Sequence, residues 1–273
     1  MDAKELIKAN RLSEARSLLV EEVKKAPTDS GKRTLLAQAL LFFGEWDKAE
    51  RHLEILAMQS ASTEIGVQVY RNLVLAEKER SEVYAGKRRP AFLGTMPTWL
   101  DLHLIACEKL RGGEIDGADK LFREIEEKTS DTSGTLDGRE FTGVRDADAF
   151  LFPFLEVFVH ECYLLLPFTS LRELSIPIPK TLLDTLWTPA AITTWEGLTT
   201  SCFLPVTYPL SAGEGDDLLR LGKMTNWQDL GGGYYRGRGQ HVLQIGEQEK
   251  GILEIRELTF AFTRGREEDE KNS

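Results

Sequence analysis

One short pattern of residues recurs along the first half of the chain, and its first two copies are 34 residues apart. Each copy has Asn or Gly, then a large apolar residue, then an alanine and a second large apolar residue at fixed intervals. The copies are Asn10-Arg11-Leu12 with Ala15 and Leu19, Gly44-Glu45-Trp46 with Ala49 and Leu53, and Gly113-Glu114-Ile115 with Ala118 and Phe122. Asn and Gly tolerate the left-handed conformation that ends a helix, and alanine lets two helices approach closely. The pattern therefore predicts a series of helical hairpins.

A period of this length is typical of tetratricopeptide-like repeats, which stack helical hairpins into an α–α superhelix. We predict hairpins at residues 3–25, 30–60 and 99–128. The interval between the last two should hold a further, degenerate hairpin, and residues 64–85 within it have apolar positions at helical spacing. The concave face of such an array usually binds a peptide or a helix. A binding function is therefore expected before a catalytic one.

Beyond residue 143 the composition changes, because seven of the ten prolines lie there and β-branched and aromatic residues come in short runs. Short strands joined by turns are the best interpretation of such a sequence. Residues 130–143, rich in Ser, Thr, Gly and Asp, read as a linker, and the charged residues 264–273 as a disordered tail. The predicted fold class is α+β in two domains: a helical-repeat domain over 1–130, and a compact α+β domain rich in short antiparallel strands over 144–263.

Two strand pairs are predicted within the second domain. Residues 155–166 form either a buried helix or two strands that turn at His160-Glu161, and the bracketing prolines favour strands. Residues 241–245 and 252–262 are predicted to pair as a hairpin around 247–251.

The charge balance narrows the range of partners. The formal net charge is -10 and the isoelectric point lies near 5.1. Nucleic acids and anionic lipids both attract basic surfaces, so neither nucleic acid nor a membrane is an expected partner. Prolines and titratable side chains interrupt the most apolar run, residues 149–168, which a membrane-spanning helix tolerates poorly. The first ten residues do not resemble a secretory signal. We therefore expect a cytoplasmic protein.

The residues able to carry chemistry are few. Asp146, Asp148 and Glu156, with His160 nearby, form a candidate acidic cluster for a metal or for acid–base work, which requires that several ligands converge in space. The alternative is that the two aspartates brace a turn through backbone N–H groups. The glycines at 231–233 are followed by tyrosines and suit a turn better than a phosphate loop. We expect no catalytic residue, no cofactor and no bound metal.

The second half also contains a series of short motifs whose order is more specific than any one of them. They are Arg145-Asp146-Ala147-Asp148, Pro153-Phe154-Leu155-Glu156-Val157, Tyr163, Pro167-Phe168, Asp184-Thr185-Leu186-Trp187, Pro205-Val206-Thr207-Tyr208-Pro209, Leu219-Arg220, Thr225-Asn226-Trp227 and Gly237-Arg238-Gly239-Gln240. In this order they resemble the ImpE/TagJ family of type VI secretion accessory proteins, whose members also begin with degenerate tetratricopeptide repeats. The resemblance covers essentially the whole chain.

The resemblance implies a cytoplasmic, non-enzymatic accessory protein of the secretion machine. Its implied partner is the small sheath subunit, whose N-terminal helix family members are thought to grasp while assisting sheath assembly or turnover. One alternative is a metal-dependent hydrolase that uses the cluster around Asp146, Asp148 and Glu156. A second alternative is a generic repeat scaffold unrelated to secretion. The oligomeric state does not follow from the sequence.

The candidate partner-binding residues lie on the first helix of the second and third hairpins, since that helix lines the concave face of a repeat array. They are Thr34, Gln38, Leu41, Phe42, His103, Leu110 and Arg111. Apolar side chains next to polar ones suit a helix with one apolar face. The alternative is that these residues pack inside the protein.

Overall fold

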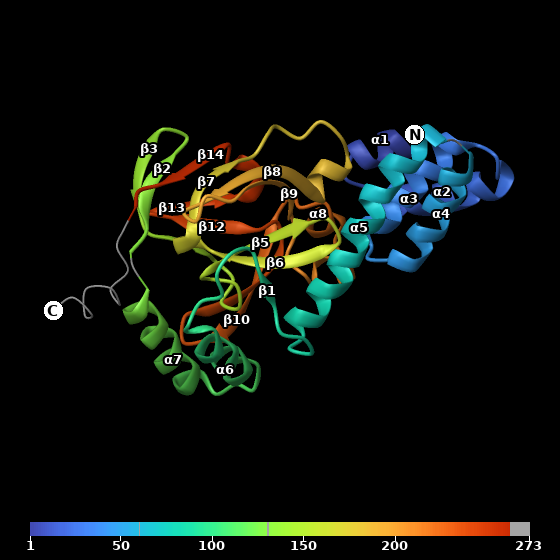
Figure 1. The fold of residues 1–273 in the computed structure, drawn as a ribbon. Helices are drawn as coiled ribbons and strands as arrows, with labels where there is room; N and C mark the ends of the chain where they lie inside the picture. Colours follow the sequence, from blue (N-terminus) through green and yellow to red (C-terminus); the bar gives the residue numbers. More distant parts are fainter. Residues whose placement is uncertain (60, 130, 263–273) are drawn as a thin grey trace.

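Helices form most of the first half of the computed structural model, which describes residues 1–59, 61–129 and 131–262 (Figure 1). They are α1 (Ala3–Lys8), α2 (Leu12–Lys25), α3 (Ser30–Phe42), α4 (Trp46–Gln59), α5 (Ala61–Tyr84), α6 (Leu100–Arg111) and α7 (Ile115–Lys128). The three predicted hairpins are confirmed as α1–α2, α3–α4 and α6–α7. Asn10, Gly44 and Gly113 take φ values of 59°, 65° and 77° at the turns, as the repeat pattern requires.

The fourth hairpin, expected between the second and the third, is wrong. The interval holds the single 24-residue helix α5, followed by a short strand, β1 (Ala91–Phe92), that pairs in parallel with a strand of the second half. Gly86, with φ 72°, ends α5, and Pro90 prevents the helix from resuming through the residues before the strand. Figure 1 shows the consequence: α6 and α7 lie apart from the bundle of α1–α4. The first helices of the second and third hairpins, α3 and α6, are therefore not neighbours.

The second half is rich in strands. They are β2 (Ser133–Leu136), β3 (Arg139–Thr142), β4 (Val144–Asp146), β5 (Phe154–Val159), β6 (Cys162–Pro167), β7 (Leu171–Ser175), β8 (Trp187–Thr194), β9 (Thr199–Pro205), β10 (Thr225–Gly231), β11 (Tyr234–Gly239), β12 (Val242–Ile245), β13 (Gln248–Gly251) and β14 (Glu257–Phe260), with a short helix α8 (Asp217–Arg220). Within the described residues, nine strands form one sheet in the order β1-β6-β5-β9-β8-β7-β14-β2-β3, and β13-β12-β4 form another. β10 and β11 form a separate ribbon. The strand pairs of the second half are antiparallel, so the predicted α+β class is confirmed.

One of the predictions for residues 130–166 is confirmed and another is wrong. The strands over 155–166 are confirmed as β5–β6, turning at His160 with φ 53°, so the helix alternative is wrong. The linker predicted at 130–143 is wrong for 133–142, which form the hairpin β2–β3. Its turn is Asp137-Gly138, a dipeptide whose two residues readily take the positive φ of a tight hairpin turn, here 49° and 81°.

The hairpin predicted around 247–251 is also partly wrong. β12 pairs with β13, which occupies that supposed turn, and β14 instead joins the large sheet between β7 and β2. A short turn at Gly246, with φ 58°, makes the tighter pairing possible. The tail predicted at 264–273 lies outside the described residues.

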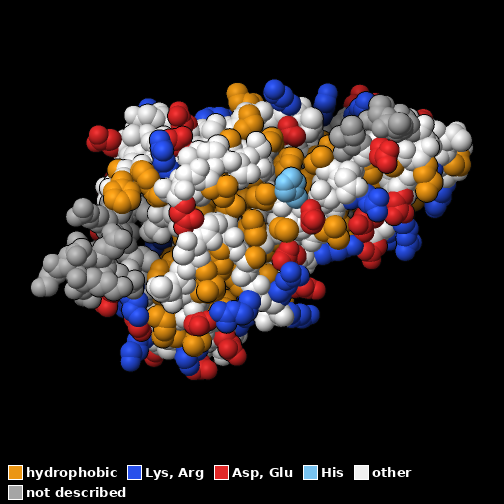
Figure 2. Space-filling view, viewed as in Figure 1, with side chains coloured by type: hydrophobic (Ala, Val, Ile, Leu, Met, Phe, Trp, Pro, Cys, Tyr) orange, Lys and Arg blue, Asp and Glu red, His pale blue; other side chains and the backbone are white. Residues whose placement is uncertain are grey.

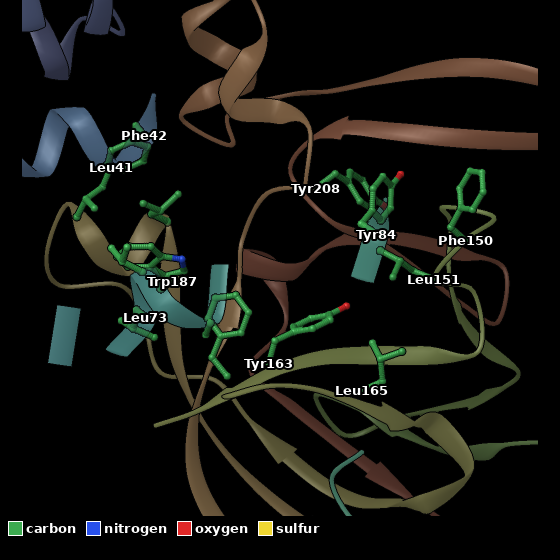
Figure 3. Packing of buried hydrophobic residues seen from close by; sticks show 14 of the residues in the cluster. Leu41, Phe42, Leu73, Tyr84, Phe150, Leu151, Tyr163, Leu165, Trp187 and Tyr208 are labelled. Atoms are coloured by element: carbon green, nitrogen blue, oxygen red, sulfur yellow. The ribbon is translucent and has the colours of Figure 1, made fainter. Parts of the chain in front are cut away.

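One hydrophobic core links helices and sheet. Buried side chains of α2, α3, α5, α6 and α7 pack in a single cluster with Phe150, Phe154, Tyr163, Trp187 and Tyr208 from the second half. Figure 3 shows Leu41, Phe42 and Leu73 on the helices near Trp187 of β8. A second cluster fills the space between the two sheets. The division into 1–130 and 144–263 stays a prediction, and packing is continuous across it.

Candidate functional sites

Two members of the candidate acidic cluster, Asp146 and Glu156, lie close together, but the histidine between them is not the one predicted. Asp148 instead accepts hydrogen bonds from Tyr84 and from the backbone of Phe150 and Gly237. Asp146 at the end of β4 and Glu156 in β5 both lie against His241: Nδ1 is 2.8 Å from Asp146 Oδ2, and Nε2 is 2.9 Å from Glu156 Oε2. His241 stands immediately before β12, and β12 pairs with β4, which explains how it reaches the cluster. His160 is exposed at the β5–β6 turn, away from these groups.

Arg80 of α5 completes the cluster and was missed by the sequence analysis. Its side chain is 1% exposed, and its Nε and Nη2 donate to the two oxygens of Glu156 at 2.8 and 2.6 Å. Nη2 also donates to the carbonyl of Thr207 at 2.8 Å, and Nη1 lies 3.3 Å from the carboxylate of Glu77. Glu77 is one helical turn earlier on the same face of α5. The guanidinium therefore holds α5 against the sheet.

Aromatic side chains supply the remaining hydrogen bonds of this buried ion network, which we define as Glu77, Arg80, Asp146, Glu156 and His241. Trp187 Nε1 donates to Glu77 at 2.9 Å, Tyr163 Oη to Glu156 at 2.7 Å, and Tyr208 Oη to Asp146 at 2.9 Å. All five members are buried. Buried charges are tolerated only when paired and hydrogen-bonded in this way.

The pKa values follow from these contacts. Burial alone would raise the pKa of Glu156, but the Arg80 guanidinium outweighs it and holds that pKa well below its usual range. Burial alone would lower the pKa of His241, but the carboxylates of Asp146 and Glu156 outweigh it and raise that pKa to about 9. His241 is therefore a cation at neutral pH. Burial, followed by the nearby charge of Asp146, raises the pKa of Asp148 to about 7.

The network already contains the cations that its carboxylates need. Arg80 and protonated His241 face Glu156, and His241 and Tyr208 occupy the oxygens of Asp146. Throughout the described ranges, no group of three or more His, Cys, Asp and Glu side chains converges as a metal site. Asp146 and Asp148 also accept backbone N–H bonds from Asp148 and Phe150, both at 2.8 Å. The turn-bracing alternative is thus confirmed for both aspartates.

The seven predicted partner-binding residues fall into three groups. Leu41, Phe42, His103 and Leu110 are at most 3% exposed, Thr34 and Gln38 are half-buried, and Arg111 is exposed. His103 Nε2 lies 3.0 Å from the carbonyl oxygen of Phe150, and burial lowers its pKa to about 4. Internal packing therefore accounts for the four buried residues.

A groove that we call the helix groove lies elsewhere on the helical bundle, between α2, α3 and α4. It encloses about 700 Å³ and is lined by Arg16, Ser17, Val20, Glu21, Val23, Lys24, Pro27, Leu36, Leu40, Glu45, Lys48 and His52. Its apolar lining is formed by Val20, which is half-buried, and by the core residues Val23, Leu36 and Leu40, which are at most 8% exposed. None of the seven predicted residues lines it. Figure 2 shows acidic and basic side chains crowded over this end of the molecule. Sequence reasoning missed the groove because it considered neither α2 nor α4 and chose other positions on α3.

The rim of this helix groove is held by ion pairs. Glu45, at the turn between α3 and α4, pairs with Arg16 of α2 and with Lys48 of α4. The Arg16 guanidinium also lies over the ring of Phe43, 5.0 Å from its centroid. These contacts tie α2 to the α3–α4 turn, so the walls of the groove are set before any partner arrives.

Fold and sites together define an α+β protein with an N-terminal helical segment, a groove between three of its helices and a buried ion network. No helix in the described part of the chain is both long and apolar enough to span a membrane. The sequence model of the family described as ImpE protein matches residues 138–259. The chain is 33% identical over 263 residues to the type VI secretion system accessory component TagJ from Pseudomonas aeruginosa, covering 96% of this chain and 92% of that protein. The chain belongs to the ImpE/TagJ family of type VI secretion accessory proteins.

A solved structure shows the same fold. A crystal structure of a protein from Vibrio parahaemolyticus superimposes with a TM-score of 0.84, covering 95% of this chain and 97% of the other at 22% sequence identity. At that identity the likeness concerns the fold alone.

Proposed function

We propose that this protein is a non-enzymatic, cytoplasmic accessory component that binds an amphipathic helix of the small sheath subunit and assists sheath assembly or turnover. The observation that carries the proposal is the helix groove between α2, α3 and α4. The family membership supports the accessory role. The identity of the helix follows from the family resemblance described above.

The chemistry of the groove matches an amphipathic helix. Such a helix buries apolar side chains at every third or fourth position and keeps charged ones at the edges. Half-buried Val20 of α2 offers apolar surface in the groove, and the core residues Val23, Leu36 and Leu40 lie beneath it. Basic and acidic side chains alternate on the rim, where they can pair with charges flanking the apolar stripe of a partner.

The test measures binding of a synthetic peptide that carries the N-terminal helix of the small sheath subunit, by isothermal titration calorimetry. Val20→Asp places a charge on the apolar wall of the groove and should weaken binding by at least ~2 kcal/mol, the cost typical of losing a central apolar contact. The matched control is Val69→Asp, the same change at a 38% exposed position of α5 outside the groove, which should leave affinity unchanged.

Two results would contradict the proposal. No binding of the wild-type protein at concentrations up to about 1 mM, the limit of weak specific association, would remove the sheath helix as partner. Equal affinities of the Val20→Asp and Val69→Asp variants would remove the groove as its site. Thermal unfolding of both variants is measured alongside, because an affinity lost together with the fold would not count as support.

A further inference from the structure

A second cavity, of about 390 Å³, lies where the C-terminal ends of α5 and α6 approach the β10–β11 ribbon. Tyr84, Leu110, Arg111, Phe150, Leu230 and Arg236 are among the residues that line it. These come from five separate segments of the chain, so the cavity exists only in the assembled fold. We call it the arginine cavity.

Two guanidinium groups meet at one aromatic ring in the arginine cavity. The Cζ atom of Arg236 lies 4.5 Å from the centroid of the Phe150 ring, and that of Arg111 lies 4.9 Å from it. Arg236 also lies over the ring of Tyr84 at 5.6 Å. Aromatic faces attract cations, which holds both groups in place. Two like charges at one ring nevertheless repel each other unless an anion joins them.

Neither guanidinium has an acidic partner among the described residues. Arg111 donates one hydrogen bond, from Nη2 to the carbonyl oxygen of Tyr84 at 2.8 Å, and forms no salt bridge there. Arg236 forms no salt bridge either, and its Nε is buried without a hydrogen-bond partner. A buried donor without an acceptor is costly, and the chain has 44 acidic side chains against 34 basic ones. Two unpaired arginines in one cavity of an acidic protein are what an anion site requires.

We propose that the arginine cavity binds an oxyanion carried on an apolar body, either a carboxylate or a phosphate monoester. Both groups match the planar fork of N–H donors that a guanidinium presents. Leu110 and Leu230, beside Tyr84, line the cavity with apolar surface for the body of the ligand. The inference rests on neither the helix groove nor the sheath partner, because the arginine cavity shares no lining residue with the groove.

The test compares anions with neutral molecules of the same shape. N-acetyl-leucine is set against N-acetyl-leucinamide, and phenyl phosphate against phenol, at constant ionic strength, with the melting temperature of the protein as readout. A ligand that binds only the folded state raises the melting temperature. At least one anion should do so and its neutral counterpart should not, and comparing the two anions separates carboxylate from phosphate.

Variants locate the effect. Arg236→Gln should abolish the anion-dependent rise, whereas Arg139→Gln, which removes the same charge from an exposed position of β3, should leave it intact. Arg236→Lys keeps the charge without the fork and should bind at least about tenfold more weakly.

A direct measurement does not depend on how the variants fold. In ¹⁵N-labelled wild-type protein, the Nε–H resonance of Arg236, assigned by its loss in Arg236→Lys, should shift on addition of the anion. An unmoved resonance with N-acetyl-leucine and with phenyl phosphate, or an equal rise in melting temperature with the neutral molecules, would overturn the proposal.

Discussion

Removing Arg80 should be among the most damaging single changes in this protein. Arg80→Met keeps much of the length of the side chain in the core but leaves Glu77 and Glu156 without their shared guanidinium. Glu156 is 4% exposed and receives two of the Arg80 hydrogen bonds, so water cannot replace them. Removing one partner of a buried ion pair typically costs about 3–5 kcal/mol. That is a large share of the roughly 5–15 kcal/mol by which a folded protein is stable.

The assay is urea unfolding at pH 7, followed by tryptophan fluorescence. With a denaturant slope of about 3 kcal/mol per molar urea, the midpoint of Arg80→Met should fall by roughly 1–2 M. Arg123→Met is the matched control, because Arg123 pairs with Asp119 at 2.8 Å while its side chain is 72% exposed. An exposed pair is screened by water and contributes little, so the control midpoint should hardly move.

A double variant tests the physical cause. Arg80→Met combined with Glu156→Gln removes both charges, so no unpaired carboxylate remains at that position. It should be less destabilised than the sum of the two single changes by about 0.5–3 kcal/mol, the usual coupling of groups in contact. Additive losses, or a loss below about 1 kcal/mol for Arg80→Met alone, would refute the claim that a buried, mutually dependent pair holds α5 to the sheet.

Three further predictions concern the titration, a turn and the core. The pKa of His241 is raised from 6.5 to about 9 in the folded state. Its contribution to the free energy of unfolding is therefore complete below pH 6.5 and is lost as the pH rises through 9. Urea unfolding at a series of pH values should show this loss of roughly 3 kcal/mol in the wild type and its absence in His241→Gln. Gly232 has φ 64°, and a Cβ added there would lie 2.5 Å from Cγ2 of Ile115. Gly232→Ala should therefore lower the free energy of unfolding by about 1–3 kcal/mol. Adding Ile115→Ala to that variant should restore part of the lost stability. Phe42 is 1% exposed, so Phe42→Ala should cost about 3–5 kcal/mol in thermal or urea unfolding, and a cost below 1 kcal/mol would argue against its place in the core.

The parts of the fold that the sequence predicted are the local ones. Helical hairpins depend on residues a few positions apart, such as Gly44 and Ala49, so one short stretch of the sequence is enough to predict them. The β5–β6 hairpin was equally readable from its bracketing prolines. The β2–β3 hairpin was not predicted, although Asp137-Gly138 is typical of a hairpin turn, because the surrounding Ser and Thr are also typical of loops.

The candidate sites were less predictable, because they join distant segments. Arg80 and Glu156 are 76 residues apart, and nothing near Arg80 in the sequence marks it as different from the other arginines of the helices. His160 was predicted to join the acidic cluster because it is close to Glu156 in the sequence. The pairing of β4 with β12 instead brings the imidazole of His241 to the cluster. Among the seven predicted residues, burial of Phe42 and His103 depends on where the second half docks. A helical pattern identifies an apolar face but not what covers it.

The buried ion network has a consequence for biosynthesis. His241 is 161 residues beyond Arg80, and a ribosome adding about 5–20 residues per second needs roughly 8–32 s to cover that interval. Asp146 is made 95 residues before His241, and from then on the emerging chain carries that carboxylate without its imidazole. The native arrangement must therefore await the synthesis of residue 241. A chain released before residue 241 would lack the imidazole that lies between the carboxylates of Asp146 and Glu156.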